Sequence, residues 1–134
     1  MSLKWATKDD FAIELPNRPG ALASLSAQLQ DAGVSLLGLW GDHSLDGKEN
    51  FHCVPESPRQ LRQWAEKEGV QISEGMTVYL HGDDTEGALV DTLEEIATAG
   101  VSIQAIQAVV IGGEFGCFLW VADDDWDALF HALD

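Results

Sequence analysis

The sequence predicts an α+β fold built from two copies of one βαββαβ unit. An ungapped offset of 67 residues, half of the 134-residue chain, aligns Gly-Ala-Leu at residues 20–22 with the same tripeptide at 87–89. It also aligns Ala-Gly-Val-Ser at 32–35 with the same tetrapeptide at 99–102. Strand-like alternation and helix-like spacing of apolar residues follow one another in the same order in both halves. Because a repeated supersecondary unit buries its apolar face against the other copy, this duplication decides the architecture.

The first copy opens with a strand and a helix. Phe11, Ile13 and Leu15 alternate with alanine and glutamate, which is typical of a half-buried strand. A segment with two prolines ends this strand, and leucines at helical spacing then predict a helix that Gly33 ends.

The rest of the first copy completes the unit. Residues 34–40 are apolar enough for a central strand, and the Asp-Gly turn signal after them predicts a hairpin with a returning strand at 51–54. Ser57 followed by proline is a typical helix start. A short last strand is expected at residues 70–72. The resulting order is that of a ferredoxin-like unit, an antiparallel sheet with helices on one face.

The second copy repeats this order. Its strands are predicted at residues 76–81, 101–111 and 115–121, and its helices at residues 87–99 and from the three aspartates at 123–125 onward. No segment is left after that helix for a last strand. Because residues 3–5 align with residues 70–72, we expect the amino-terminal segment to supply the missing edge strand of the second unit. We place the two units at residues 7–73 and 74–134.

The chain is strongly acidic, with 23 acidic against 7 basic residues and a net charge of −16. Such a surface repels nucleic-acid phosphates and anionic lipid headgroups, so we expect neither nucleic-acid nor membrane partners. No apolar run approaches the length of about 18 residues that indicates a transmembrane helix. The first residues lack the apolar stretch of a signal peptide, so we expect a cytoplasmic protein.

Residue types that hold metals or perform catalysis are present but poorly spaced. Cys53 and Cys117 lie at non-equivalent positions of the repeat and are expected to be free, buried thiols. Residues 42–47 fit the opening of a calcium loop, but Cys53 stands where that loop requires glutamate. No two histidines have metal-ligand spacing, and no serine or cysteine has a nearby base. We therefore predict no metal, no cofactor and no catalytic residues.

Two segments carry a family resemblance. Residues 15–22 read Leu-Pro-Asn-Arg-Pro-Gly-Ala-Leu, and Ala-Gly-Val-Ser follows one helix length later at 32–35. They resemble the ACT domain family, in which a strand ends in a short polar loop with Pro-Gly, a helix begins with Ala or Val and Leu, and Ala-Gly-Val-Asn-Ile follows. In the second copy, residues 83–89 keep the glycine and lack the proline. The resemblance spans nearly the whole chain and is greatest to small stand-alone proteins made of two ACT units.

The resemblance implies a regulatory module that binds a small molecule and is not an enzyme. ACT domains, as in phosphoglycerate dehydrogenase and aspartate kinase, usually bind amino acids at interfaces between paired units. They use the loop after the first strand and the residue after Gly-Val on the facing unit. The residues implied as ligand-binding are Asn17, Arg18, Gly20, Ala21, Leu22 and Ser35 in the first copy, and Asp84, Thr85, Gly87, Ala88 and Ser102 in the second. The family often has asparagine at the positions of Ser35 and Ser102.

The residues of the two loops also suit such a ligand on chemical grounds. A glycine at a helix start lets a ligand approach the backbone, where N–H groups suit a carboxylate. Arg18 could bind a carboxylate with two hydrogen bonds, whereas Asp83, Asp84 and Glu86 could hold an ammonium group. Valine at Gly20 is expected to abolish binding and to leave the fold largely intact, provided that φ is negative there.

Other functions remain open on this fold. The chain could be a protein-interaction module with degenerate sites that regulates a partner such as a metabolic enzyme, and its first loop would then only turn a corner and start a helix. A small hydrolase is a third possibility. We also expect a homodimer with a two-fold axis, because helices on one face leave the other face of the sheet open. The apolar residues expected to need cover on that open face are Leu36, Leu39, Ile103 and Ile106.

Overall fold

The computed structural model describes the chain in four segments, residues 3–16, 18–43, 49–84 and 87–134. The chain forms two compact units. The first unit is Asp9–Gly75, and the second combines Met1–Lys8 with Met76–Asp134. Two long strands, β1 (Lys4–Leu15) and β4 (Ser73–Asp83), each contribute residues to both units.

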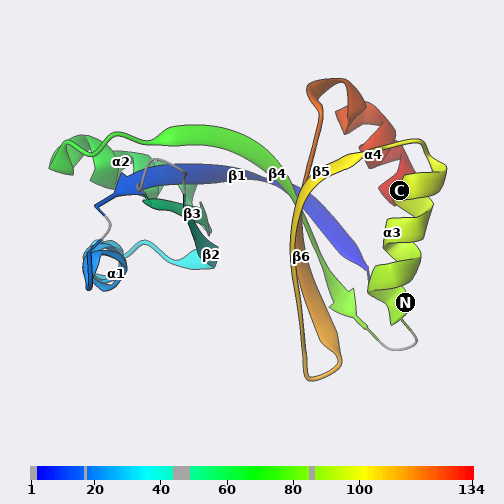
Figure 1. Ribbon diagram of the computed structural model, residues 1–134, viewed down its shortest axis with the longest axis horizontal. Coiled ribbons are helices and arrows are strands. Elements are labelled where there is room, and N and C mark those ends of the chain that lie inside the picture. The colour runs from blue at the N-terminus through cyan, green and yellow to red at the C-terminus, as the bar shows by residue number, and fades with distance from the viewer. Residues whose placement is uncertain (1–2, 17, 44–48, 85–86) are drawn as a thin grey trace. The chain divides into compact units, whose positions relative to one another are not determined.

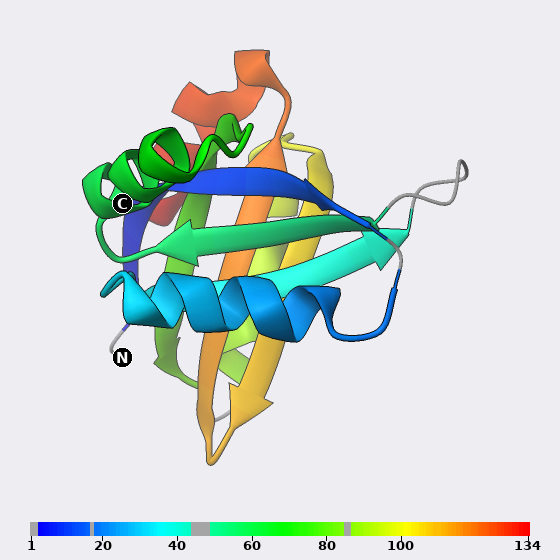
Figure 2. The ribbon, with the colours of Figure 1, turned by 90° about the vertical axis from the view of Figure 1, so that its left-hand side faces the viewer.

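The first unit has the βαββαβ order that its apolar pattern predicts. Its other elements are α1 (Ala21–Asp31), β2 (Leu36–His43), β3 (Glu49–Pro55) and α2 (Pro58–Glu68). The strand order is β2-β3-β1-β4, and β3 pairs antiparallel with both β1 and β2. Both helices lie on one face of this sheet (Figure 2). The ferredoxin-like arrangement of the first copy is therefore confirmed.

Local signals set the ends of the two helices. The Ser57 hydroxyl caps α2 by accepting a hydrogen bond from the Gln60 N–H at 3.4 Å, and Pro58 occupies the first helical turn. Gly69 ends α2 and Gly33 follows the end of α1, both in the left-handed conformation with φ of 67° and 76°. Of these residues, Ser57, Pro58 and Gly33 are the start and stop signals that the sequence predicts.

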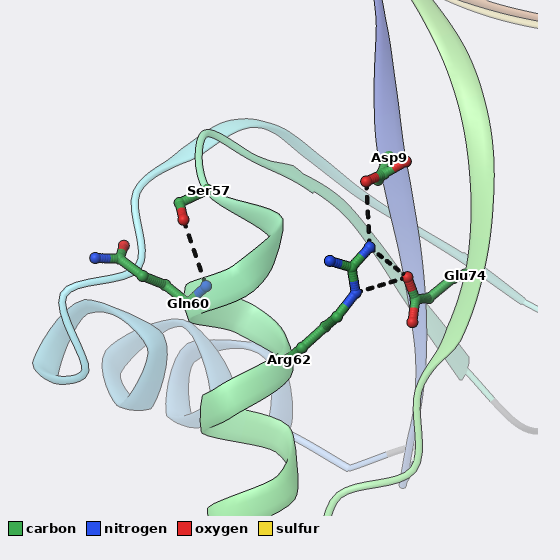
Figure 3. Close-up of polar contacts among 5 residues, drawn as sticks. All are labelled: Asp9, Ser57, Gln60, Arg62 and Glu74. Carbon is green, nitrogen blue, oxygen red and sulfur yellow. Dashed lines mark hydrogen bonds and ion pairs between the residues drawn. The ribbon is translucent and has the colours of Figure 1, made fainter.

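The core of the first unit lies between its sheet and its helices. It consists of buried residues from alternate strand positions and from the inner helix faces: Phe11, Ile13, Leu25, Leu29, Val34, Phe51, Cys53, Leu61, Trp64 and Ala65. At the edge of this core, Arg62 of α2 donates hydrogen bonds to Glu74 of β4 at 2.9 Å and to Asp9 of β1 at 3.2 Å (Figure 3). These side chains are about half exposed, so the ion pairs orient α2 more than they stabilise it.

The second unit repeats the arrangement of the first. Its elements besides β1 and β4 are α3 (Ala88–Thr98), β5 (Ile103–Ile111), β6 (Glu114–Val121) and α4 (Trp126–Leu133). The strand order is β1-β4-β6-β5, and α3 and α4 lie on one face of the sheet (Figure 1). The three aspartates expected to open the last helix form a short 3₁₀ helix, Asp123–Asp125, which precedes α4.

The amino-terminal segment completes the second unit. β1 lies beside β4, and Leu3 and Trp5 pack against the second core. The Trp5 ring stacks on Phe130 of α4, with 5.4 Å between the ring centroids. The core that they cover consists of Val78, Leu80, Ala88, Ile96, Val101, Phe115, Cys117, Leu119, Val121 and Leu129. The predicted edge strand from the amino terminus is therefore confirmed.

Two strand boundaries differ from the sequence prediction. The sequence predicts separate strands at residues 3–5 and 11–15, whereas β1 is continuous, because neither proline nor glycine interrupts the residues between them. The strand predicted at residues 70–72 is also wrong, since β4 begins only at Ser73. The Val70 N–H instead donates to a carbonyl of α2, at 2.9 Å, as part of the helix cap.

The strand register corrects the expected open face. The four residues expected there, Leu36, Leu39, Ile103 and Ile106, lie on the helix-covered side of their sheets. Leu39 pairs with Cys53 and Ile106 pairs with Leu119, and both partners are core residues. Directly paired residues of neighbouring strands point to the same side of a sheet. The other two pack against the two cores.

Both cysteines are buried free thiols, as the sequence predicts. The pKa of both thiols is raised to about 12, by burial for Cys117 and by burial together with the nearby Asp10 carboxylate for Cys53. The thiols therefore stay protonated near neutral pH, where the thiolate is the reactive form.

Candidate ligand-binding site

The first implied binding loop joins β1 to α1. The Arg18 N–H donates to the carbonyl of Pro16 at 2.9 Å, and the Ala21 N–H donates to the carbonyl of Arg18 at 3.3 Å. Gly20 stands before the helix in the left-handed conformation, with φ of 86°. Of the implied residues, Arg18, Gly20 and Leu22 are exposed, Ala21 is buried, and Asn17 lies outside the described residues.

The conformation of Gly20 overturns the expectation for valine at this position. No heavy atom of the described residues lies within 4 Å of the place that a Cβ would take. The strain is instead in the backbone, because a β-branched residue at φ of 86° is a steric outlier and the left-handed conformation costs about 1–2 kcal/mol. Loss of binding in a valine variant would therefore not separate a ligand contact from a disturbed helix start.

The second implied loop joins β4 to α3 and supplies its own anion. Oδ1 of Asp84 accepts a hydrogen bond from the Leu89 N–H at 3.1 Å, in the first turn of α3. The Asp84 N–H donates to the carbonyl of Gly113 at 2.7 Å, and Gly87 is left-handed with φ of 77°. The Asp84 carboxylate thus occupies the helix start at which a ligand carboxylate would bind. Ala88 is buried here, and Thr85 lies outside the described residues.

Replacing Asp84 with alanine is expected to destabilise the protein by about 1 kcal/mol, because the first turn of α3 loses its acceptor. Asp84→Asn keeps an acceptor oxygen and should cost less. Urea unfolding followed by tryptophan fluorescence measures both losses. Asp91→Ala is the matched control, since Asp91 is an exposed acid in the same turn. Equal losses from Asp84→Ala and Asp91→Ala would show that charge alone matters and that the cap does not.

The two serines lie at the other helix ends. Ser35 and Ser102 are exposed, and each follows a buried valine before the next strand. Because α1 and α3 have 11 residues each, a helix of about 16 Å separates Gly20 from Ser35 and Gly87 from Ser102. Within either unit alone, the loop and its serine cannot enclose one small ligand, so a facing unit would have to supply the serine.

A groove that sequence reasoning missed lies on the open face of the second unit. Its volume is about 450 Å³, which is within the range of small-ligand sites. Tyr79 and His81 alternate with core residues of β4, so they point away from the helices. The Tyr79 ring stacks on His81, with 5.0 Å between centroids. The lining consists of Lys4, Tyr79, His81, Gly82, Asp83, Val109, Ile111, Glu114, Phe115 and Gly116.

Strand pairing arranges the groove in rows. His81 of β4 is opposite Gly116 of β6, and Gly116 is opposite Val109 of β5. The next row along the same strands consists of Asp83, Glu114 and Ile111. Gly116 therefore lies between an imidazole and a valine, and the space is left where its side chain would be.

The first unit has a groove at the repeat-equivalent place. Its volume is about 410 Å³, and it is lined by Ala12, Glu14, Asn50, Gln71, Ile72 and Ser73. With the offset of 67, half of 134, Ala12 corresponds to Tyr79, Glu14 to His81 and Gln71 to Lys4. This lining therefore includes neither an aromatic ring nor a cation. The outward positions of the first strand in each copy are the sequence signal that could have located both grooves.

Neither a metal cluster nor a membrane helix is found among the described residues. In these segments, no group of three or more His, Cys, Asp or Glu side chains could hold a metal ion. No helix of the same segments combines the length and the apolar character that crossing a membrane requires.

No family model and no curated protein matches the sequence. Protein BT0572 from Bacteroides thetaiotaomicron is similar in structure, with a TM-score of 0.82 at 15% identity over 96% of this chain and 88% of that chain. The ligand-free regulatory subunit of aspartate kinase from Thermus thermophilus gives 0.66 at 12% identity, over 98% and 93%. E. coli aspartokinase III, solved in complex with lysine and aspartate, gives 0.56 at 15% identity, over 98% of this chain and 32% of that one. The chain therefore has the fold of aspartate kinase regulatory subunits, which is the tandem ACT fold that its sequence predicts.

Proposed function

We propose that the protein is a non-catalytic regulatory module that binds an amino acid. The observation that carries this proposal is the similarity to a regulatory subunit of aspartate kinase, which extends over 98% of this chain and 93% of that subunit. The match thus covers a whole regulatory subunit and not a catalytic domain. The lysine and aspartate bound in the complex of E. coli aspartokinase III support an amino acid as the ligand class.

Within this proposal, the first loop is the better carboxylate site. Its Arg18 is exposed, whereas the start of α3 is already occupied by Asp84. A helix N-terminus contributes only about 0.3–1 kcal/mol, so a ligand at Gly20 needs enclosure from a facing unit. A homodimer would supply it, with Ser35 or Ser102 closing the site. Asn17 and Leu22 would complete the contacts of this loop, and Thr85, Gly87 and Ala88 those of the second.

A cytoplasmic protein-interaction module is the second candidate, and one strand favours it. β5 is an edge strand of its sheet and has no charged residue in a chain of net charge −16. Val109, Val110 and Ile111 are 55%, 50% and 72% exposed. Apolar edge strands of this kind pair readily with another chain, which could be a second copy or a metabolic enzyme.

A thermal-shift screen with the twenty amino acids tests the proposal. At least one amino acid is expected to raise the melting temperature, because a ligand at 100 times its dissociation constant adds about 2.7 kcal/mol to the free energy of unfolding. Sedimentation of the same samples measures the expected dimer. If no amino acid shifts the transition, amino-acid sensing is wrong and the interaction module becomes the leading function.

A further inference from the structure

We infer that the groove on the open face of the second unit is a binding site for one apolar α-amino acid, separate from the loops at the helix starts. This inference rests on the proposed function for the class of ligand. Its location rests on the groove itself.

The first argument for a binding site is Gly116, whose lack of a side chain leaves the groove open. It lies within β6, where glycine weakens a strand. Its φ is outside the left-handed region, and no heavy atom of the described residues lies within 4 Å of the place that its Cβ would take. Neither backbone conformation nor packing therefore requires glycine here. A ligand that lies close to the backbone between His81 and Val109 would account for glycine at this position.

The apolar surface of the groove suits a hydrocarbon or aromatic side chain. The rings of Tyr79 and His81 are nearly parallel, with 23° between their planes, and the Tyr79 ring continues onto Phe118 at 5.0 Å. On the opposite wall, Val109 and Ile111 are 55% and 72% exposed. A ligand side chain placed over Gly116 would remove apolar surface of both walls from water.

The polar groups of the groove suit the two charges of a zwitterion. Asp83 and Glu114 are directly opposite each other on β4 and β6, so two carboxylates line the same part of the groove. These carboxylates can bind a ligand ammonium group, and the net charge of −16 favours its approach. Lys4 lines the same groove from β1 and can bind the carboxylate.

The groove of the first unit provides an internal comparison. Ala12 and Gln71 replace Tyr79 and Lys4 there, so that groove has neither the aromatic wall nor the cation. The inference therefore predicts one sheet-face ligand per chain, although the chain is a duplication.

Calorimetric titration of the full chain with L-phenylalanine and with L-leucine tests the inference. Binding of at least one of them at one equivalent per chain is expected. Gly116→Val should weaken it at least tenfold, because its side chain fills the space over which the ligand lies. Ala12→Val, in the groove of the first unit, is the matched control and should leave the affinity unchanged. Should Gly116→Val not fold, Ile111→Ser at a largely exposed position gives the same test.

Two analogues of phenylalanine test the contacts of its carboxylate and of its ammonium group separately. Phenethylamine lacks the carboxylate and 3-phenylpropionate lacks the ammonium, so each should bind at least tenfold more weakly than phenylalanine. Lys4→Gln should weaken phenylalanine and leave phenethylamine unchanged. If an amino acid binds and Arg18→Ala abolishes binding while Gly116→Val does not, this site is wrong and the proposed function stands. If none of the twenty amino acids binds, both are wrong.

Discussion

Deleting residues 1–6 is expected to destabilise the second unit by about 3 kcal/mol or more and to promote aggregation. The deletion removes Trp5, which stacks on Phe130 of α4, and Leu3, which packs against the same core. Replacing a large buried aromatic residue costs about 3–5 kcal/mol, and Trp5 is partly buried. The deletion also exposes the hydrogen-bonding edge of β4, which can then pair with other chains.

Urea unfolding and light scattering measure these two effects. Trp5→Ala should show the loss of stability without the exposed edge, since the backbone of β1 remains. Lys4→Ala is the matched control, because Lys4 is an exposed residue of the same strand. A truncated protein that melts at the temperature of the full chain would contradict the role assigned to the amino-terminal strand.

The duplication made most of the fold predictable. The 67-residue register assigned an edge strand to the amino terminus, although that strand lies beside β4, about seventy residues away in sequence. Capping signals placed the helix boundaries, since Ser57 and Gly33 act through short-range hydrogen bonds and backbone geometry. What the pattern could not show is that β1 and β4 each pass from one unit into the other, because the apolar alternation describes each copy separately.

The faces of β2 and β5 were not predictable in the same way, and both are edge strands, not the central strands that the apolar sequence predicts. Residues 34–40 are almost all apolar, so no alternation marks the inner side. In addition, the register of these two strands is irregular at equivalent places, between Leu36 and Gly38 in β2 and between Ile103 and Ala105 in β5. Such an irregularity changes which side the following residues face. Only the observed pairing could correct the expected open face.

The candidate sites also differed in how far the sequence could predict them. The glycines at the helix starts were visible in the sequence because each precedes a helical pattern. The groove was not, because Lys4, Tyr79 and Glu114 come from three different strands and meet only through their pairing. Of these three residues, only Tyr79 lies in a segment where the alternation of apolar residues predicts a strand, and there it occupies an outward-facing position.

Replacing Gly75 with alanine is expected to destabilise the first unit by about 1–3 kcal/mol. Gly75 lies in β4, and the Cβ of an alanine there would be 2.7 Å from Oδ1 of Asp10 on the neighbouring β1. Cβ atoms in proteins essentially never lie this close to another heavy atom, so the carboxylate or the strand must move. Oδ1 of Asp10 is buried beside Gly75, so either the carboxylate turns away from this position or the two strands separate.

A double-mutant cycle with Asp10→Ala separates this contact from the general preference of strands for alanine over glycine. If the carboxylate causes the loss, Gly75→Ala should cost much less in the Asp10→Ala background, with a coupling energy of at least about 0.5 kcal/mol. Gly116→Ala is the control, because its Cβ would meet no described heavy atom within 4 Å and should leave stability unchanged or raise it. If Gly75→Ala proves as harmless as Gly116→Ala, Asp10 moves freely. Glycine at this point of β4 is then not required by the carboxylate beside it.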